Sequence, residues 1–225
     1  MKTIYDIILS LPLFQGIERS KLILLLEKVV LKFEKYQRND VIFCKGDECK
    51  QLIFLLKGSI LSETIDKSNK FSIYEQRKGQ SVLFPSFLFG RNTQYPASVK
   101  ALDNVSTLEI DKQQFLYLMK NEDIFMLNFL NIVSNKAQSS FEKIISLSEP
   151  DLKKNLAFFI LSFTEKGSTN ICIKSTQQNL ADFFGVARPS LLKVINELRD
   201  EGIIEYKRKE LSILDVDRLS NILYT

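Results

Sequence analysis

The sequence predicts an α+β protein with a β-rich N-terminal part, one long helix and a small helical module that ends in a β-hairpin. Short apolar runs separated by turn residues recur from residue 29 to residue 110, which is typical of strands. Apolar residues at helical spacing follow, and Glu149-Pro150 ends that pattern because proline disfavours helical geometry in the preceding residue. The 225 residues also exceed the ~150 of a typical domain. We therefore expect three parts, with boundaries at residues 1–111, 112–149 and 150–225.

The composition excludes several kinds of chemistry. The chain has no histidine, so it lacks Ser-His-Asp and Cys-His nucleophile pairs and any histidine ligand for haem or zinc. Three cysteines, Cys44, Cys49 and Cys172, are too few for a four-cysteine iron–sulfur or zinc site. We therefore expect no enzyme activity, no metal, no haem and no iron–sulfur cluster. The odd cysteine count without a signal peptide, and the lack of a long apolar run, predict a cytoplasmic protein that makes no membrane contact.

The N-terminal part begins with helical spacing and then becomes strand-like. Pro12 and Gly16 interrupt the helical pattern between residues 3 and 28. The expected strands include residues 29–31, 41–43, 52–56, 59–61, 71–74 and 105–110. A β-sandwich, a β-barrel or a β-roll is compatible with this spacing.

A long helix is expected from about residue 122 to residue 147, after a short one at 113–120. Steps of four and three residues alternate along one of its faces, which is the heptad seam of a helix that pairs with its own copy. The seam residues are Met126, Leu130, Val133, Ala137, Ser140 and Ile144, followed by Leu147. A second apolar set beside the seam is expected to pack on the β-rich part; it comprises Phe125, Phe129, Ile132, Phe141 and Ile145. A helix that faces only the core of its own chain is the alternative interpretation.

Residues 175–200 match a helix-turn-helix. Ser175 is expected to cap the first helix, with Gln178 as its capping-box partner. Ala181 is small where two helices would cross, and Gly185 suits a turn that needs a positive φ. The second helix is expected to bury Leu191, Val194 and Leu198 and to carry Pro189 in its first turn. Such a second helix fits the major groove of DNA, whereas a helical hairpin without DNA contact is the alternative.

Basic residues on this module are the candidate DNA contacts. Arg188 and Lys193 lie on the expected exposed face of the second helix, where arginine can grip a guanine through two hydrogen bonds. The module carries eleven basic against ten acidic residues, so placement matters more than net charge, which is +4 for the whole chain. A solvated turn is the alternative reading of the basic hairpin tip. The candidates are Arg188, Pro189, Ser190, Lys193, Thr176 and Gln177 on the helices, and Lys207, Arg208 and Lys209 at the hairpin tip.

Nearly the whole chain resembles the Crp–Fnr superfamily of bacterial transcription regulators. The resemblance rests on residues 11–16, 42–47 and 54–60, on the long helix, and on residues 179–190 with Gly202-Ile203-Ile204. It implies a double-stranded, jelly-roll-like β-roll that senses an effector, a dimerisation helix and a C-terminal winged helix-turn-helix. It further implies a homodimer on double-stranded DNA at a palindromic site, with RNA polymerase as a partner.

The effector cassette departs from the cyclic-nucleotide members of that superfamily. Leu83-Phe84 stand where those members carry Gly-Glu, and Tyr95-Pro96 stand where they carry Arg-Ser. Cyclic AMP would therefore lose its cationic partner, and we do not expect it to bind tightly. The apolar and aromatic segment of residues 82–89, with Tyr95, forms either a pocket for an apolar or aromatic effector or a pocket that its own side chains fill. The candidate pocket residues are Leu83, Phe84, Arg91, Tyr95 and Ser98, where Arg91 alone could rescue phosphate binding.

Two functions compete on these grounds. The first is a dimeric, sequence-specific DNA-binding transcription regulator. The second is a small-molecule or cyclic-nucleotide sensor that acts through protein contacts, which the helix-turn-helix disfavours. A redox pair of Cys44 and Cys49 is a further alternative to two incidental cysteines.

Overall fold

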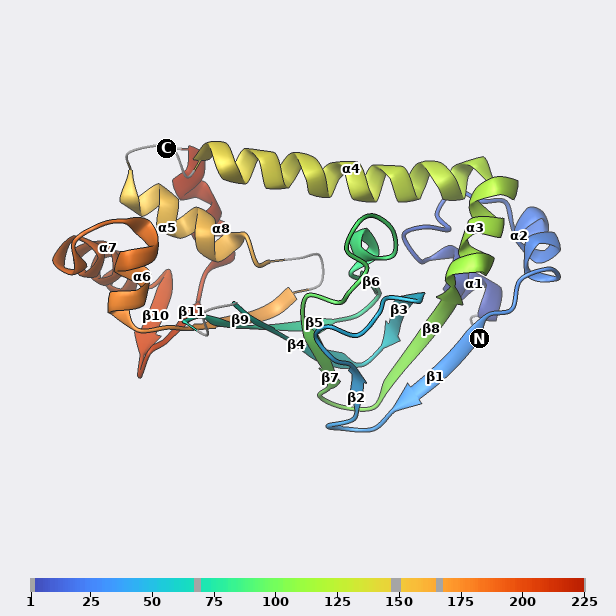
Figure 1. Cartoon of the computed structure of the whole chain (residues 1–225), viewed down its shortest axis with the longest axis horizontal. Coiled ribbons are helices and arrows are strands. Elements are labelled where there is room, and N and C mark those ends of the chain that lie inside the picture. The colour runs from blue at the N-terminus through green and yellow to red at the C-terminus, as the bar shows by residue number, and fades with distance from the viewer. Residues whose placement is uncertain (1–2, 67–69, 147–150, 165–167, 225) are drawn as a thin grey trace. The chain divides into compact units, whose positions relative to one another are not determined.

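The computed structural model describes residues 3–66, 70–146, 151–164 and 168–224. It divides into two compact units, which Figure 1 shows with their elements labelled. The N-terminal unit comprises Met1–Ile60 and Lys78–Gln138, and the C-terminal unit comprises Leu61–Arg77 and Ser139–Thr225. Residues 61–77, which the sequence places in the first part, thus group with the C-terminal module, while the three boundaries expected from the sequence stay a prediction.

Two short helices open the N-terminal unit, α1 (Ile4–Leu9) and α2 (Arg19–Leu26). The Thr3 hydroxyl accepts a hydrogen bond from the backbone N of Asp6, and the Asp6 carboxylate accepts one from the backbone N of Thr3, which makes a capping box. Phe14, in the segment between the helices, is fully buried. The helices therefore close one end of the hydrophobic core of this unit.

Antiparallel strands form the β-roll of the N-terminal unit. One sheet has the order β1-β8-β3-β6, and β2 pairs with β7 in a second sheet. The expected strand at residues 29–31 is wrong, because Val29 is buried as a loop residue and the strand begins at Lys32. The strands are β1 (Lys32–Tyr36), β2 (Val41–Phe43), β3 (Gln51–Lys57), β6 (Ser81–Leu83), β7 (Ser98–Ala101) and β8 (Val105–Asp111), and a 3-10 turn follows β6 at Pro85–Phe87.

Helices α3 (Lys112–Asn121) and α4 (Asp123–Ser146) follow the last strand of the β-roll. Phe125 and Phe129 of α4 are buried against Phe115 of α3, with ring centroids 5.2 and 4.9 Å apart, as expected. Phe141 and Ile145, which were also expected to pack inward, are 64% and 53% exposed. That part of the prediction is wrong, because these two residues belong to the stretch of α4 beyond Gln138, where the N-terminal unit ends.

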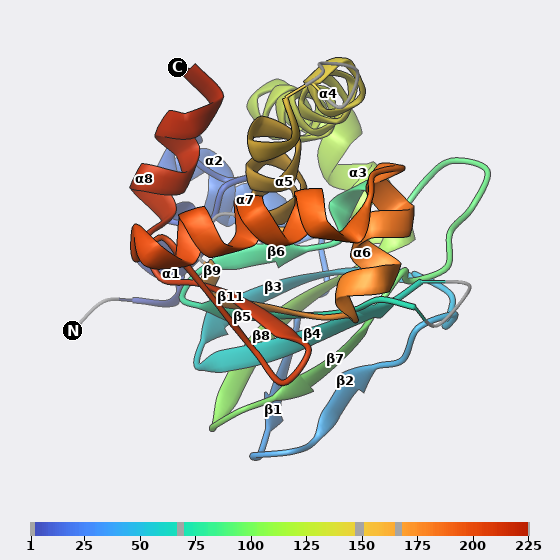
Figure 2. The ribbon, with the colours of Figure 1, turned by 90° about the vertical axis from the view of Figure 1, so that its left-hand side faces the viewer.

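The C-terminal unit joins a winged helix-turn-helix to a β-hairpin from the middle of the chain. Strand β9 pairs with β11 on one side and with β5 on the other, so the strands of this unit follow the order β10-β11-β9-β5-β4 within their sheet. Figure 2 shows α6 and α7 joined by a tight turn, with the β10–β11 hairpin below α7. The elements are β4 (Ser59–Ile65), β5 (Ser72–Lys78), α5 (Leu152–Leu161), β9 (Ser168–Lys174), α6 (Gln177–Phe184), α7 (Arg188–Asp200), β10 (Ile204–Lys207), β11 (Glu210–Ile213), α8 (Val216–Asn221) and a final 3-10 turn, Ile222–Tyr224.

The hairpin strand β5 carries a buried ion pair. Glu75 and Arg77 lie two residues apart, so both side chains are on the same face of the strand. The guanidinium of Arg77, which is 2% exposed, lies 2.8 Å from the carboxylate of Glu75. Over the residues that the structure describes, no helix is long and apolar enough to cross a membrane.

Candidate DNA-binding and effector sites

The first helix of the helix-turn-helix, α6, is capped by Thr176. Its hydroxyl accepts a hydrogen bond from the backbone N of Asn179 at 3.0 Å. The sequence assigned this cap to Ser175, which is wrong, because Ser175 is buried one residue earlier and its hydroxyl donates to the carbonyl O of Lys70 at 3.1 Å. The side-chain oxygen of Thr176 therefore caps the N-terminus of α6.

The turn between α6 and α7 depends on Gly185, whose φ is +64°. The next backbone N, that of Val186, donates to the carbonyl O of Ala181 at 3.1 Å. Ala181 itself is fully buried, which allows the two helices to cross closely as the sequence predicts. This local geometry determines where α7 begins.

Helix α7 buries a stripe at steps of four and three residues: Leu191, Ile195 and Leu198. Leu191 and Leu198 confirm the prediction. Val194 does not, because it is only partly buried and Ile195 takes the inward position. A helix that buries residues 191, 195 and 198 turns Ser190 and Lys193 away from the core. Arg188, three residues before Leu191, is exposed as the first residue of the helix.

The exposed side of α7 carries the predicted DNA contacts. Arg188, Pro189, Ser190 and Lys193 are all exposed, and Arg188 and Pro189 are the first two residues of the helix. The Arg188 guanidinium donates to Oε1 of Gln177 at 2.9 Å, so the structure brings together candidates from both helices. Arg188 is thereby oriented at the start of the helix before any DNA is bound.

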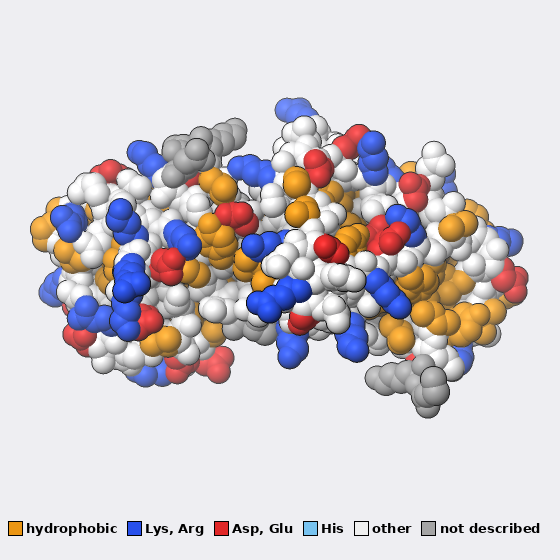
Figure 3. All heavy atoms as spheres, turned by 90° about the horizontal axis from the view of Figure 1, so that it is seen from below, with side chains coloured by type: hydrophobic (Ala, Val, Ile, Leu, Met, Phe, Trp, Pro, Cys, Tyr) orange, Lys and Arg blue, Asp and Glu red, His pale blue; other side chains and the backbone are white. Residues whose placement is uncertain are grey.

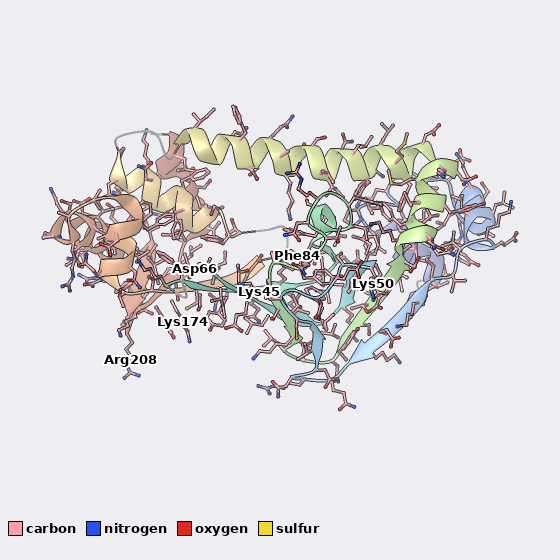
Figure 4. The ribbon with its side chains drawn as sticks, viewed as in Figure 1. Lys45, Lys50, Asp66, Phe84, Lys174 and Arg208 are labelled. Carbon is pink, nitrogen blue, oxygen red and sulfur yellow. The ribbon has the colours of Figure 1, made fainter. Side chains whose placement is uncertain are left out.

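The β10–β11 hairpin has a two-residue turn made of Arg208 and Lys209, with φ values of +51° and +70°. Positive φ at both central residues is typical of a type I′ turn, which favours asparagine and glycine. Two long basic residues stand in this position instead, and Figure 4 shows the Arg208 side chain pointing away from the ribbon. Lys207 precedes them and pairs with Glu205. The tip is therefore a strained, exposed basic turn.

Two hydrogen bonds tie this hairpin to the start of α6. The backbone N of Ser175 donates to the carbonyl O of Lys209 at 2.9 Å, and the Tyr206 hydroxyl donates to the carbonyl O of Ser175 at 2.8 Å. The sequence does not predict this role for Tyr206, because the residue pattern of a strand does not show which carbonyl group a tyrosine hydroxyl contacts. The hairpin tip and the helix-turn-helix thus form one connected surface.

On the face of the molecule that Figure 3 shows, Lys and Arg side chains lie in several groups interspersed with Asp and Glu. Lys174 and Glu210, for example, pair at 3.0 Å beside the hairpin. Attraction to DNA would therefore depend on the position of a few basic residues.

Aromatic side chains of the β-roll surround three of the predicted effector residues. Tyr95 stacks on Phe43 with ring centroids 3.8 Å apart, and the ring of Phe84 lies 5.9 Å from that of Phe43. Leu83, Phe84 and Tyr95 are at most 8% exposed. The structure therefore brings these three together in the core of the N-terminal unit.

The two remaining effector candidates lie outside that buried set. Arg91 is exposed, so the structure does not place it among the buried candidates. Ser98 is partly buried, and its hydroxyl accepts a hydrogen bond from the backbone N of Lys45 at 2.9 Å. The buried candidates thus lie among aromatic rings, and the basic candidate Arg91 is not one of them.

A buried carboxylate, that of Glu109, also lies in the β-roll. It accepts hydrogen bonds from the Tyr36 hydroxyl at 3.0 Å and the Gln51 side-chain amide at 2.6 Å. Burial, with the neighbouring Glu109 carboxylate, raises the pKa of Tyr36. The Tyr95 hydroxyl donates to the carbonyl O of Gln51 at 3.3 Å, and burial chiefly raises the pKa of Tyr95. The sequence did not reveal this network, because Glu109 lies in an otherwise ordinary strand.

The predicted dimer seam lies along α4. Met126 and Val133 are partly buried, Leu130 is 48% exposed, and Ala137 and Ser140 are exposed. The side chain of Ile144 lies outside the described residues. Apolar side chains are thus left uncovered along a helix of 24 residues, and the pairing of two such helices stays a prediction.

Comparisons with known proteins place the chain among transcription regulators. Residues 155–222 match the family model of the Crp-like helix-turn-helix domain, and residues 33–122 match that of the cyclic nucleotide-binding domain. Together these matches define a regulator with a helix-turn-helix and a β-roll of the cyclic-nucleotide type. The chain belongs to the Crp–Fnr superfamily of transcription regulators, as the resemblance implied.

Its relatives are distant in sequence and similar in length. The Anaerobic regulatory protein of Aggregatibacter actinomycetemcomitans is 21% identical over 201 residues, which cover 86% of this chain and 77% of the relative. The Global nitrogen regulator of a Nostoc species is 22% identical over 187 residues, covering 80% and 84%. The crystal structure of the Thermus thermophilus Catabolite Activator Protein shares the fold, with a TM-score of 0.54, 16% identity and coverage of 95% and 98%. These relatives are regulators and not enzymes.

Proposed function

We propose that the chain forms a homodimer that binds a palindromic promoter site and inserts α7 of each copy into the major groove. The observation that carries the proposal is the exposed face of α7, where Arg188, Ser190 and Lys193 follow a tight, glycine-capped turn. Helix-turn-helix proteins present the first residues of their second helix to base edges in this way. RNA polymerase is the proposed protein partner, and such a regulator acts in the cytoplasm, where bacterial DNA is.

Each basic group has a role that its position supports. Arg188, at the first position of α7, can hold a guanine through two parallel hydrogen bonds. Lys193 lies one turn further on and reaches either a guanine or a phosphate. Arg208 and Lys209 at the hairpin tip contact the phosphate backbone beside the groove, and Thr176 and Gln177 support the start of the recognition surface.

The effector is not cyclic AMP in this proposal. A cyclic phosphate needs a buried cation, and the residues at that position of the cassette are the aromatic Tyr95 and its neighbour Pro96. Burying an unpaired anion there would cost several kcal/mol. We likewise propose no haem and no iron–sulfur cluster, since the chain has no histidine and three cysteines.

A gel-shift assay on promoter fragments from the host genome tests the proposal. Wild type should shift a fragment, and Arg188→Ala or Lys193→Ala should weaken binding of the dimer by about 30-fold or more, since one base contact of ~1–3 kcal/mol is lost in each half-site. Arg199→Ala is the matched control, because Arg199 lies on the same helix, is exposed and pairs with Asp200 in its last turn. It should bind about as tightly as wild type.

The absence of any sequence-specific shift with wild type would contradict the proposal and favour a sensor that acts through protein contacts. An equal loss in Arg188→Ala and Arg199→Ala would also contradict it, because it would show a general charge effect.

A further inference from the structure

The turn end of the β4–β5 hairpin is hydrogen-bonded to the start of the helix-turn-helix. The carbonyl O of Lys70 accepts a hydrogen bond from the Ser175 hydroxyl at 3.1 Å and another from the Asn179 side-chain amide at 3.4 Å. All three residues belong to the C-terminal unit. The backbone of Lys70 is therefore held beside α6, the first helix of the helix-turn-helix.

Ser175 also connects this hairpin to the tip of the β10–β11 hairpin. Its hydroxyl donates to Lys70, and its backbone N donates to the carbonyl O of Lys209 at 2.9 Å. The strand register agrees, because the end of β9 at Lys174 is paired with β5 on one side and with β11 on the other. Figure 4 labels Lys174, the last residue of β9, and Arg208 in the hairpin turn. Neighbouring strands lie ~4.8 Å apart, so the backbones of Lys70 and Lys209 are roughly 10 Å apart, on either side of Ser175.

Lys70 adds a positive charge beside the predicted DNA contacts. Its side chain is exposed, and no carboxylate among the residues that the structure describes pairs with it. Lys174 on the neighbouring strand differs, because its ammonium pairs with Glu210 at 3.0 Å. The start of α7 is connected to the same region, since Gln177 accepts a hydrogen bond from the Arg188 guanidinium at 2.9 Å. The Lys70 ammonium is therefore available to an anion that approaches this surface.

The phosphate backbone of DNA matches this arrangement of charge. Each strand of a duplex carries one phosphate per about 3.4 Å of helix axis. Basic groups that are roughly 10 Å apart can therefore contact different phosphates of one backbone. Arg208 and Lys209 are already assigned to phosphates beside the groove, and Lys70 continues that row of basic residues on the other side of Ser175.

We propose that Lys70 contacts a DNA phosphate, which makes the β4–β5 hairpin a third part of the DNA interface beside α7 and the β10–β11 hairpin. The inference rests on the proposed function, because it requires α7 in the major groove. It also goes beyond that function, since residue 70 lies in the part of the sequence, residues 1–111, to which the resemblance assigns effector sensing. DNA binding then depends on a hairpin outside the winged helix-turn-helix.

Gel shifts of the full chain at several salt concentrations test this contact. Lys70→Gln should weaken binding to different DNA sequences alike, because a phosphate contact reads no base. The slope of log affinity against log salt should fall in magnitude by about two for the dimer, since one phosphate contact is lost in each copy. The substitution keeps the carbonyl O that Ser175 and Asn179 contact, and circular dichroism checks that the variant folds.

Lys78→Gln is the matched control. Lys78 is also exposed, but it is the last residue of β5, whereas Lys70 precedes the first residue of that strand. This variant loses the same charge and should keep the salt slope of wild type. Ethylation of single phosphates supplies a second measurement. It should reveal one phosphate in each half-site whose ethylation weakens binding of wild type but has no further effect on Lys70→Gln.

The contact and the proposed function can be told apart when they fail. An unchanged salt slope in Lys70→Gln, or an equal fall in Lys70→Gln and Lys78→Gln, would overturn the contact. The same pattern of ethylation interference for wild type and Lys70→Gln would overturn it too. In these cases wild type still shifts DNA, so the proposed function stands. If wild type shifts no DNA, the proposed function is wrong and the contact is wrong with it.

Discussion

Cys44 and Cys49 are five residues apart and lie in different surroundings. Cys44 is exposed, whereas Cys49 is 2% exposed in the core of the N-terminal unit. Burial raises the pKa of the Cys49 thiol, and it also raises the pKa of the partly buried Cys172. A thiol reacts as its thiolate, so a raised pKa and burial both slow it at a given pH. These surroundings do not favour a redox pair.

At pH 8 we therefore expect one fast thiol, that of Cys44, in a reaction with a coloured disulfide reagent. Cys49 and Cys172 should react at least tenfold more slowly, because less thiolate is present and access is restricted. The Cys44→Ser variant should lack the fast phase, and the Cys172→Ser variant should keep it. Equal rates for Cys44 and Cys49 would contradict the burial described for Cys49.

The turn of the β10–β11 hairpin combines a strained backbone with two basic side chains. A left-handed conformation costs a residue other than glycine about 1 kcal/mol or more, and Arg208 and Lys209 both adopt it. Asparagine and glycine adopt this turn with less strain. Strained residues persist where their side chains serve a function, so the turn supports a role for the basic pair in phosphate binding.

The double variant Arg208→Asn with Lys209→Gly should weaken DNA binding without lowering the stability of the fold. The free energy of unfolding in urea should stay equal or rise by about 1 kcal/mol, because the turn is relieved. Binding to DNA should weaken, and the slope of log affinity against log salt should fall in magnitude by about four for the dimer, since two phosphate contacts are lost in each copy. A variant that is less stable, or that binds DNA with an unchanged salt slope, would contradict this role.

Local constraints explain which elements the sequence predicts well. The helix-turn-helix depends on Ala181, Gly185 and an apolar stripe within about 25 residues, so it can be recognised from the spacing of these residues in the sequence. The pairing of β5 with β9 joins residues about 100 positions apart, and no local pattern indicates it. The contact between the rings of Phe71 and Phe183, whose centroids lie 5.4 Å apart, could not be predicted for the same reason.

The residues of the candidate sites also divide into those that local spacing predicts and those that depend on contacts distant in the sequence. Lys193 could be assigned to the exposed face of α7 from helical spacing alone, whereas Arg188 is exposed because it is the first residue of the helix. The inward position of Ile195 instead of Val194 depends on how α7 rotates against its neighbours, which spacing fixes only to within one residue. Glu109 could not be recognised, since its hydrogen-bond partners Tyr36 and Gln51 come from separate strands.

For the whole molecule, the proposed function requires two copies, because a palindromic site presents two half-sites to two recognition helices. We propose that helix α4 supplies the surface for this pairing. Leu130, at the predicted seam, is 48% exposed in the single chain, so a second copy would cover apolar area that now faces water.

Leu130→Glu should therefore convert the dimer to a monomer in sedimentation experiments at micromolar concentration, because two carboxylates would face each other across the seam. Asn135→Glu is the matched control, since Asn135 is exposed on the opposite side of the same helix and should leave the dimer intact. If both variants dimerise equally, the seam is wrong.

Selection of bound DNA from a random library tests the central claim most directly. A dimeric helix-turn-helix regulator should enrich an inverted repeat whose half-sites are centred about 10 base pairs apart or a multiple of that spacing. The Arg188→Ala variant should lose preference at one position in each half-site, since Arg188 is assigned to a base edge. Enrichment of no sequence, or of a single site without two-fold symmetry, would contradict the account.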